Sequence, residues 1–285
     1  MNKTLSTIAV AAAIGCASIN AEAQTMIGKT TDVAAISKGD RMTPETLWAM
    51  GRIGGAAASP DGKTVAYQVG YYSVKQNKSH QMLYIMNVDG SGIKALTTDA
   101  KSETDASWIA NGTKIAFLRE GEIWTMDANG ENRKKLSDTE GAIEGYKFSP
   151  DGKKVILLKS LDYHGTIKKN PSDLPLATGR LVTDMNYRHW DHYVEQISHA
   201  FVADVTENGI ANVVDILEGE PYECPLAPFG GIEQLDWSID SKLVAYTCRK
   251  KEGVDYAIST DADIYIYNVE TKQTRNICKP DGYKE

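Results

Sequence analysis

The sequence has 285 residues, of which 24% are charged and 42% are hydrophobic, and its formal net charge at pH 7 is −7. A mildly acidic chain without a dominant basic run is a poor candidate for binding nucleic acid or an anionic membrane, so we expect neither as a partner. The length is ample for a buried core, and about 260 residues remain for one all-β domain after the signal peptide described next.

The N-terminus has the pattern of a secretion signal over residues 1–23. Lys3 supplies the positive charge, residues 5–14 are apolar but too short for a stable membrane anchor, and Ala21-Glu22-Ala23 is a small-x-small cleavage site. Cleavage between Ala23 and Gln24 would leave an exported protein, periplasmic or secreted. No later stretch is apolar enough to cross a membrane, so we expect no membrane partner once the signal is removed.

The four cysteines leave two questions open. Cys16, preceded by Ala13-Ile14-Gly15, is an alternative lipoprotein site, although a large aliphatic residue is usual where Ala13 stands. The other thiols, Cys224, Cys248 and Cys278, show no Cys-x-x-Cys spacing, which gives zinc or redox motifs little support. In an oxidising compartment one disulfide could form among them, and free cysteines are the alternative.

Residues 24–55 are predicted to be a lead-in with one short helix. Thr43 is a natural N-cap and Pro44 suits the first helical position. The apolar side of this helix would be formed by Leu47, Trp48 and Met50, and its end is marked by Gly51, Gly54 and Gly55.

From residue 56 to 285 a four-fold repeat determines the expected architecture. Each copy brings a strand to a tight turn of the Ser-Pro-Asp-Gly type and leaves on a short strand rich in Val, Ile, Ala and aromatic residues. The copies of the turn are Ser59-Pro60-Asp61-Gly62, Ile109-Ala110-Asn111-Gly112, Ser149-Pro150-Asp151-Gly152 and Ser238-Ile239-Asp240-Ser241. A second hairpin follows in each copy, turning at Asp89-Gly90 in the first and at Asn129-Gly130 in the second.

Four antiparallel strands per unit, repeating at roughly 40 to 50 residues, indicate β-propeller blades. The sequence therefore predicts an all-β fold of about four blades, which we expect to be an incomplete propeller. The aromatic residues before three of the turns, Trp108, Phe148 and Trp237, are expected to pack between neighbouring blades.

The longest interval between turns predicts an insertion in the third blade, at about residues 160–198. Leu174-Pro175 and residues 181–195 do not alternate as strands do, and the latter stretch resembles a helix, so the insertion should be partly helical. It contains Arg188-His189-Trp190-Asp191-His192-Tyr193, the densest cluster of chemically capable side chains in the chain. This cluster could pack on the propeller, face a ligand or partner, or bind a metal through His189, Asp191 and His192, and the last alternative has the weakest spacing evidence.

These features together resemble one family. The lead-in Met42-Thr43-Pro44-Glu45-Thr46-Leu47-Trp48, the Ser-Pro-Asp-Gly-Lys blades and the insertion from Asp173-Leu174-Pro175 to Asn186-Tyr187-Arg188-His189-Trp190-Asp191 are similar to the N-terminal part of secreted prolyl oligopeptidase-family serine peptidases. The dipeptidyl-peptidase 5 and acylaminoacyl-peptidase branch is the nearest type. The blade motif alone is shared with Tol-system propellers and many scaffold propellers.

The resemblance implies a C-terminal α/β-hydrolase domain with a Gly-x-Ser-x-Gly nucleophile elbow, which this sequence does not contain. Its five histidines, His80, His164, His189, His192 and His199, all lie in the blades or the insertion, so no catalytic residue is carried over. We expect the chain to be a fragment of a longer enzyme, and we expect no cofactor.

The expected function is that of the propeller portion of an exported serine exopeptidase acting on short peptides. The propeller would filter substrates by size, and Asp191, with Glu195, would hold the free amino group of the substrate, since an ammonium requires an anionic partner. Arg188 and Trp190 are further candidates for substrate binding. The alternative is a non-enzymatic periplasmic propeller of the Tol type that binds other proteins.

Overall fold

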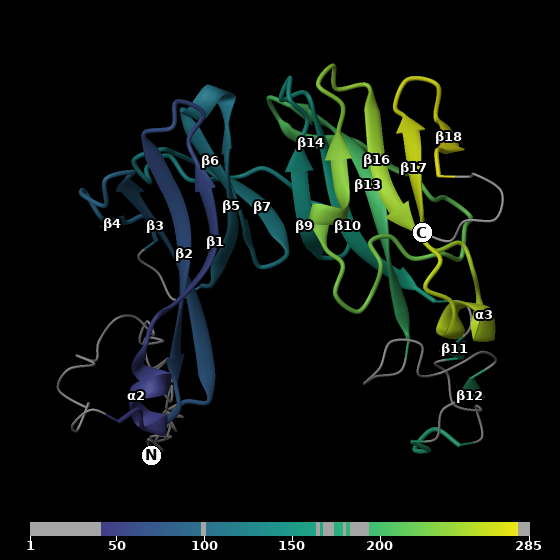
Figure 1. The fold of residues 1–285 in the computed structure, drawn as a ribbon, viewed down its shortest axis with the longest axis horizontal. Helices are drawn as coiled ribbons and strands as arrows, with labels where there is room; N and C mark the ends of the chain where they lie inside the picture. The colour runs from purple at the N-terminus through teal and green to yellow at the C-terminus, as the bar shows by residue number, and fades with distance from the viewer. Residues whose placement is uncertain are drawn as a thin grey trace, which may run out of the picture.

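In a computed structural model, the chain folds into four four-stranded antiparallel sheets. The structure describes residues 41–97, 101–163, 166–167, 174–178, 181–182 and 194–278. The sheets stand side by side in an arc, with the first at one end and the fourth at the other (Figure 1). Strands run in sequence order from one edge of each sheet to the other, which is the arrangement of a propeller blade. The expected all-β blades are confirmed.

The strand bounds follow the repeat. Blade 1 consists of β1 (Arg52–Ala58), β2 (Thr64–Ser73), β3 (Lys78–Asn87) and β4 (Lys94–Ala95). Blade 2 consists of β5 (Glu103–Ile109), β6 (Lys114–Arg119), β7 (Glu122–Asp127) and β8 (Lys134–Lys135). Blade 3 consists of β9 (Ile143–Phe148), β10 (Lys154–Asp162), β13 (Gln196–Thr206) and β14 (Gly209–Asp215). Blade 4 consists of β15 (Leu235–Trp237), β16 (Leu243–Cys248), β17 (Asp263–Asn268) and β18 (Gln273–Asn276).

Outside the blades lie two short helices, α2 (Pro44–Ala49) and α3 (Gly253–Ile258), and a small hairpin of β11 (Thr166–Ile167) and β12 (Leu181–Val182). Single turns of 3-10 helix occur at Ala110–Gly112 and Ile232–Gln234. None of the helices described here has the length and apolar character that a membrane span requires.

Three of the four tight turns close with the same side-chain hydrogen bonds. In the first turn, Ser59 Oγ donates to Asp61 Oδ1 at 2.6 Å and accepts from the backbone N–H of Thr64 at 3.0 Å. The same Ser–Asp bond occurs in the third and fourth copies, Ser149–Asp151 and Ser238–Asp240. The second copy lacks this pair and turns instead with Ala110 and Asn111 at positive φ, 49° and 54°. Three of the four turns are therefore closed by a hydrogen bond between their own side chains.

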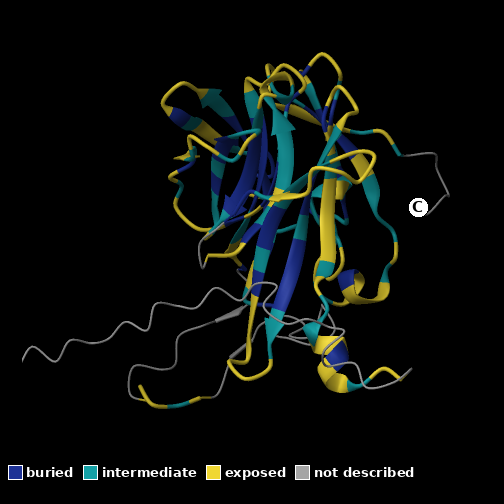
Figure 2. Ribbon diagram, turned by 90° about the vertical axis from the view of Figure 1, so that its left-hand side faces the viewer, coloured by how far each residue is buried: buried dark blue, intermediate teal, exposed yellow. Residues whose placement is uncertain are grey.

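The core lies between blades. Strand β10 alternates two buried sets, because Val155 and Leu157 pack toward blade 2 whereas Ile156 and Leu158 pack toward blade 4. A strand buried on both faces reads as a continuous apolar run, as the sequence of β10 does. Figure 2 shows the buried residues following the middle of the sheets and the exposed ones following the loops.

The aromatic residues before the turns join neighbouring blades, as predicted. Trp108 Nε1 donates to the main-chain oxygen of Ala57 in blade 1 at 2.9 Å, and Trp237 Nε1 donates to that of Lys147 in blade 3, also at 2.9 Å. Phe148 packs on the core between blades 2 and 3 and has no donor. There the neighbouring Tyr146 supplies the hydrogen bond, from its hydroxyl to the oxygen of Asp105.

The lead-in helix agrees with prediction at its start and differs on its packing face. Thr43 Oγ1 accepts from the N–H of Thr46 at 3.2 Å, which confirms the N-cap. The expected apolar side is half-exposed, with Leu47 at 44% and Trp48 at 41%, and the buried residue is Thr46. The reason is that Trp48 packs at the edge of blade 1, on Tyr72, instead of entering the core.

Two sequence-derived boundaries differ from the observed elements. Strand β1 starts at Arg52, ahead of the boundary at residue 56, because a register shift between Ile53 and Ala56 accommodates two glycines in the strand. Strands β10 and β13 remain paired from Lys154–Asp204 to Asp162–Gln196, so residues 160–162 and 196–198 belong to the blade and not to the insertion.

The insertion itself was expected to be helical over residues 181–195. Of the four described residues in this stretch, Leu181 and Val182 form a strand instead, paired with Thr166–Ile167, and residues 194–195 are not helical. Residues 183–193 lie outside the described part of the chain. Two-residue strands are too short to leave an alternating pattern in the sequence.

Candidate functional site

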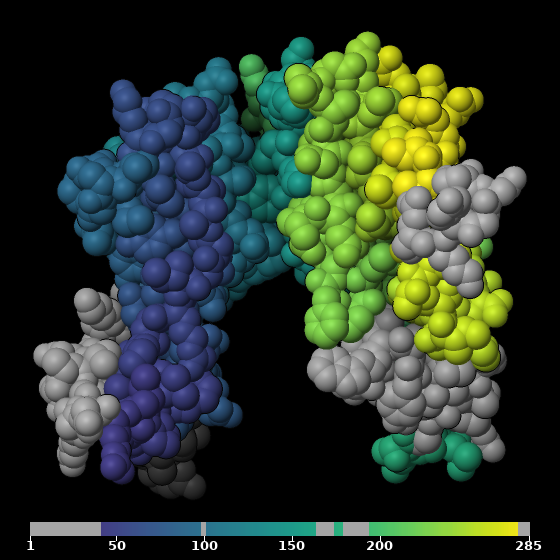
Figure 3. All heavy atoms as spheres, viewed as in Figure 1, coloured from purple at the N-terminus to yellow at the C-terminus, as the bar shows by residue number. Residues whose placement is uncertain are grey.

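The two ends of the blades differ in how much chain they carry. One end, the turn rim, carries the tight turns at residues 59–63, 110–113, 149–153 and 238–242. The other end, the connecting rim, carries the connections between second and third strands at 74–77, 163–195 and 249–262. Figure 1 shows α2, α3, β11 and β12 on the connecting rim, and Figure 3 shows that the molecule is hollowed between the two ends of the arc on this side. Binding sites favour such elaborated loops on a rigid scaffold.

The insertion in blade 3 is fixed firmly at its base. The N–H of Tyr163 donates to the backbone oxygen of Glu195 at 2.9 Å, which continues the β10–β13 ladder by one step. Tyr163, Val194 and Ile197 form a small buried cluster there. The two chain segments that flank the insertion are therefore held together at its base.

The sequence-predicted substrate residues fall mostly beyond the described chain. Arg188, Trp190 and Asp191 lie outside the described residues, as do Ala23 and Gln24 of the predicted cleavage site. Glu195 is described and lies at the base of the insertion, where its backbone closes the ladder. The metal alternative at His189, Asp191 and His192 also lies outside. Within the residues that the structure describes, no three histidine, cysteine or acidic side chains are placed to hold a metal ion.

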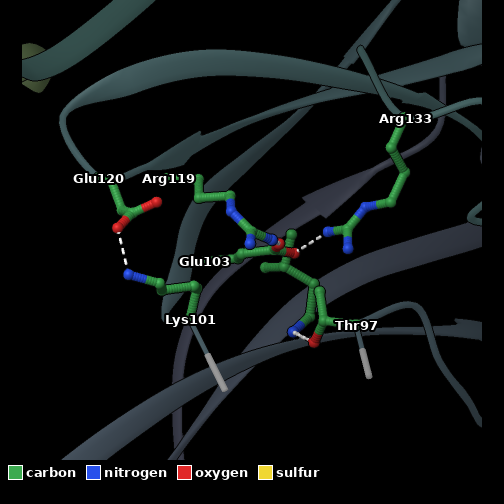
Figure 4. Close-up of polar contacts among 7 residues, drawn as sticks. Thr97, Lys101, Glu103, Arg119, Glu120 and Arg133 are labelled. Carbon is green, nitrogen blue, oxygen red and sulfur yellow. Dashed lines mark hydrogen bonds and ion pairs between the residues drawn. The ribbon is translucent and has the colours of Figure 1, made fainter. Parts of the chain in front are cut away.

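A buried charge cluster in blade 2 was not anticipated from sequence. Glu103, at the start of β5, is fully buried and accepts from Arg119 Nη1 at 2.7 Å and from Arg133 Nη2 (Figure 4). Arg119 stands directly opposite Glu103 on β6, so the strand register creates the pair. A buried carboxylate held by two guanidinium groups is a structural ion pair, because little of its charge is left for a substrate.

Around this cluster, polar contacts join blade 2 to blade 1. The N–H of Gln81 donates to Ser102 Oγ at 3.1 Å, and that of Asp105 donates to Gln68 Oε1 at 3.0 Å. Thr97 Oγ1 accepts from the N–H of Leu83 at 3.0 Å within blade 1. The cluster therefore belongs to the seam between the two blades. A glutamate on an inner strand facing an arginine was the signal that could have revealed it.

A polar pocket of about 370 Å³ lies at the connecting rim of blade 4, beside α3. Its charged lining is already paired, with Lys251 Nζ 3.3 Å from Asp261 and Lys250 Nζ 2.6 Å from Glu220. Asp263 accepts from Asn276 Nδ2 at 2.6 Å. These pairs leave no net charge for a ligand to neutralise.

The thiols at this place are inert. Burial raises the pKa of Cys248 to about 12 and raises that of Cys224 well above its ordinary value. All three described cysteines, Cys224, Cys248 and Cys278, are free, which agrees with the free-thiol alternative and not with the disulfide. A protonated thiol is neither a nucleophile nor a metal ligand.

A second pocket, of about 360 Å³, lies at the connecting rim of blade 1 between α2 and the β2–β3 hairpin. We call it the first-blade pocket. Its lining is Trp48, Tyr72, Ser73, Val74, Asn77, Lys78 and Ser79. The rings of Trp48 and Tyr72 meet edge to face with centroids 5.4 Å apart. The volume is within the range of small-molecule sites, and none of these lining residues is acidic.

Comparison with known proteins identifies the type of propeller. Dipeptidyl-peptidase 5 of Porphyromonas gingivalis is 42% identical over 281 residues, which cover 97% of this chain and 40% of that protein. Dipeptidyl-peptidase 5 of Porphyromonas endodontalis is 38% identical over 245 residues, covering 85% of this chain and 36% of that protein. The chain matches the propeller region of a prolyl oligopeptidase-family peptidase. It spans 40% or less of the length of these two curated relatives.

A solved structure gives the same fold for this peptidase-related propeller. The acylaminoacyl peptidase of Pyrococcus horikoshii superposes with a TM-score of 0.57 at 14% identity, over 81% of this chain and 33% of that one. At this identity the likeness concerns the fold alone. No known protein-family profile matches the chain. The family resemblance expected from the lead-in and the blade motifs is confirmed.

Proposed function

We propose that this chain is the propeller portion of an exported serine exopeptidase, of the dipeptidyl-peptidase type, that admits short peptides and helps to bind them. The observation that carries the proposal is the 42% identity with a dipeptidyl-peptidase 5 over 97% of the chain. Relatives at this level of identity share the fold throughout the matched segment. The buried interfaces between its blades make this segment a rigid scaffold.

The uneven rims support the role in admission and binding. Tight turns at one end leave little surface for a ligand, whereas helices, a strand hairpin and a pocket gather at the connecting rim. A hydrolase domain seated over this rim would enclose a chamber whose wall is the arc of blades, and long or folded substrates would not enter. The insertion, with Arg188, Trp190, Asp191 and Glu195 as sequence-based candidates, would reach into this chamber.

The test is hydrolysis by the longest in-frame protein that the gene encodes, secreted and purified. We expect release of p-nitroaniline from dipeptide p-nitroanilides with a free amino group, little release from the N-acetylated dipeptide, and no release by the 285-residue chain alone. Preference for the acetylated single residue would indicate an acylaminoacyl peptidase instead. An in-frame stop directly after the chain, or no hydrolysis of either kind, would refute the proposal.

A further inference from the structure

Blade 4 packs on blade 3 with one face, and its other face is apolar and incompletely buried. The side chains of β16 and β17 that pack toward blade 3 are Val244, Tyr246, Tyr265 and Tyr267. The alternate side chains, which we call the open face, are Leu243, Ala245, Ile264 and Ile266. Every residue of the first set is buried and none of the second set is. Blade 4 ends the arc in Figure 1, so the open face looks away from the other three blades. A sheet face that meets water is normally polar, and this one is not.

The same position in each of the first three blades lies in an interface with the following blade. By the strand registers, the equivalents of Ile264 are Leu83, Ile123 and Ala200. Each of these three is 0% exposed, because the following blade packs on it, whereas Ile264 is 38% exposed. The open face therefore has the composition and the register of a face that receives another blade.

Basic side chains on the outer strands reach across two of the interfaces. Lys94 on β4 donates from Nζ to the main-chain oxygen of Asn129 in blade 2 at 2.8 Å. Lys134 holds the equivalent position on β8 and donates to the oxygen of Glu207 in blade 3 at 3.2 Å. Each lysine thus links its own blade to the outer hairpin of the following one.

Arg275 is the equivalent residue of blade 4. It stands opposite Ile266 on β18, as the two lysines stand opposite the equivalents of Ile266, and it is exposed. Blade 3 has Val214 at this position, and a pocket of about 230 Å³ remains there in the interface with blade 4. An arginine on the last outer strand therefore restores the donor that blade 3 lacks.

The inner strand of blade 4 offers an acceptor at the opposite edge of the open face. In two interfaces the indole of the following blade, Trp108 or Trp237, donates to a main-chain oxygen of the preceding inner strand, that of Ala57 or Lys147. By the strand registers, the equivalent residue of blade 4 is Asp236. Its main-chain oxygen is placed to accept from an aromatic donor in the same way.

We propose that the open face of blade 4 binds a further four-stranded blade. Ala245, Ile264 and Ile266 form the apolar contact, Arg275 donates to a main-chain oxygen in the outer hairpin of that blade, and the oxygen of Asp236 accepts from an aromatic side chain before its first turn. This inference rests on the proposed function, because the longer protein would supply the blade.

The competing occupant is blade 1 of a second copy of this chain. At the positions where the other blades carry Tyr146 or a tryptophan that donates across the interface, blade 1 has Ala56 and Ala58. An alanine side chain has no donor for the oxygen of Asp236. A second copy would therefore leave this acceptor without the hydrogen bond that the three described interfaces each contain.

The test is maleimide labelling of a cysteine placed on the open face, in the 285-residue chain and in the longest in-frame protein. The control is Val213→Cys on β14, because the side chains of Ile264 and Val213 are 38% and 39% exposed. In the chain we expect Ile264→Cys and Val213→Cys to be labelled at similar rates. In the longer protein we expect Ile264→Cys to be labelled at least about tenfold more slowly, because the packed blade must open before the reagent enters, and Val213→Cys to be unchanged. Peptide mass spectrometry distinguishes these thiols from the native ones.

Two results would overturn the proposal. One is equal labelling of Ile264→Cys in the chain and in the longer protein. The other is protection of Ile264→Cys in the chain alone that increases with protein concentration, which would identify a second copy as the occupant.

A second pair of variants tests the role of Arg275. In the longer protein, Arg275→Gln should lower the midpoint of thermal unfolding by about 2 °C, because a hydrogen bond across the interface is lost, and in the chain it should have no effect. The control Lys272→Gln removes one positive charge from the preceding hairpin on the side of blade 3, and it should have the same effect in both proteins. Equal shifts for Arg275→Gln in the two proteins would remove this residue from the interface.

Failure here can be told apart from failure of the proposed function. Hydrolysis of dipeptide p-nitroanilides by the longer protein, without protection of Ile264→Cys, would refute the interface alone. Protection of Ile264→Cys in the longer protein without any hydrolysis would refute the peptidase and leave the interface in place.

Discussion

The indole nitrogen of Trp237 donates a hydrogen bond to the main-chain oxygen of Lys147, 2.9 Å away, and so joins the first strand of blade 4 to the first strand of blade 3. Trp108 makes the same bond to Ala57 at the interface of blades 2 and 1. The aromatic ring supplies apolar burial, and its N–H satisfies a carbonyl that faces the neighbouring blade. At two of the three blade interfaces, a tryptophan placed before the turn therefore joins consecutive blades.

Removing this N–H should weaken the blade interface. We expect Trp237→Phe to lower the free energy of unfolding by about 1–2 kcal/mol, because the ring is kept while the oxygen of Lys147 loses its donor. Urea unfolding followed by circular dichroism measures the change. The matched control is Trp48→Phe, since the indole nitrogen of Trp48 has no acceptor within the described part of the chain, and there the loss should be below about 0.5 kcal/mol. Equal losses in both variants would contradict this account.

The buried carboxylate of blade 2 should be far more sensitive than an exposed one. Glu103→Gln leaves Arg119 and Arg133 without their anion, and we expect a loss of about 3 kcal/mol in the free energy of unfolding. The control Glu120→Gln removes an ion pair with Lys101 in which both side chains are about half-exposed, and it should cost less than about 1 kcal/mol. Chemical denaturation of both variants measures the two losses in the free energy of unfolding. A loss for Glu103→Gln no larger than that for Glu120→Gln would show that the cluster is dispensable for stability.

The tight turns should contribute to the acid sensitivity of the fold. The hydrogen bond from Ser59 holds the pKa of Asp61 below its ordinary value, and Ser149 does the same for Asp151. A carboxyl whose pKa is lowered by folding stabilises the native state above its unfolded pKa, and this stabilisation is lost as the pH falls through the folded pKa. NMR titration should therefore find both carboxyls titrating below about pH 3.8, and Ser59→Ala should raise the pKa of Asp61 while leaving that of Asp151 unchanged.

The buried thiols should resist alkylation. With its pKa raised to about 12, Cys248 is almost wholly protonated at pH 8, and Cys224 is held in the same state by burial. Iodoacetamide at pH 8 should modify half-buried Cys278 first, and modification of the other two should require urea. Peptide mass spectrometry before and after denaturation reports the order. Rapid labelling of Cys248 in the native protein would be incompatible with its place in the core.

The proposed role of the insertion residue Asp191, as a partner for the substrate's free amino group, can be tested directly. In the longer protein, Asp191→Asn should raise the KM for dipeptide p-nitroanilides by about tenfold or more, because an ammonium loses its charged partner. Asp173→Asn, elsewhere in the same insertion, serves as the control and should leave the KM unchanged. An unchanged KM for Asp191→Asn would remove this residue from the site.

Much of the fold could be predicted because its signals are local. The Ser-x-Asp turn satisfies itself within five residues, and the aromatic residue before it identifies the blade face, so both can be recognised without knowing the neighbours. The Glu103–Arg119–Arg133 cluster could not be predicted in the same way. The cluster requires the β5–β6 register, which places Arg119 opposite Glu103, and it requires Arg133, next to β8, to reach the same carboxylate. Both conditions are met only when the sheet has formed.

The first-blade pocket was missed for a related reason. Trp48 was recognised as an apolar residue of the lead-in helix, but its contact with Tyr72 depends on where the helix lies against the hairpin. Arg52 fell within the predicted lead-in of residues 24–55, whereas it begins β1, with its guanidinium carbon 4.8 Å from the ring centroid of Trp48 and 4.4 Å from that of Tyr72. The helix could be predicted from its cap, and its packing partner could not.

The contrast between the two rims has a consequence for how this scaffold can diversify. Because three of the four tight turns on one side close with the same Ser–Asp bond, residues can be added at the opposite side, as the long excursion between β10 and β13 demonstrates, without any change in the geometry that keeps neighbouring sheets in contact. Lineages can therefore alter what this rim binds by lengthening or trimming these excursions, while the architecture that supports them is inherited intact.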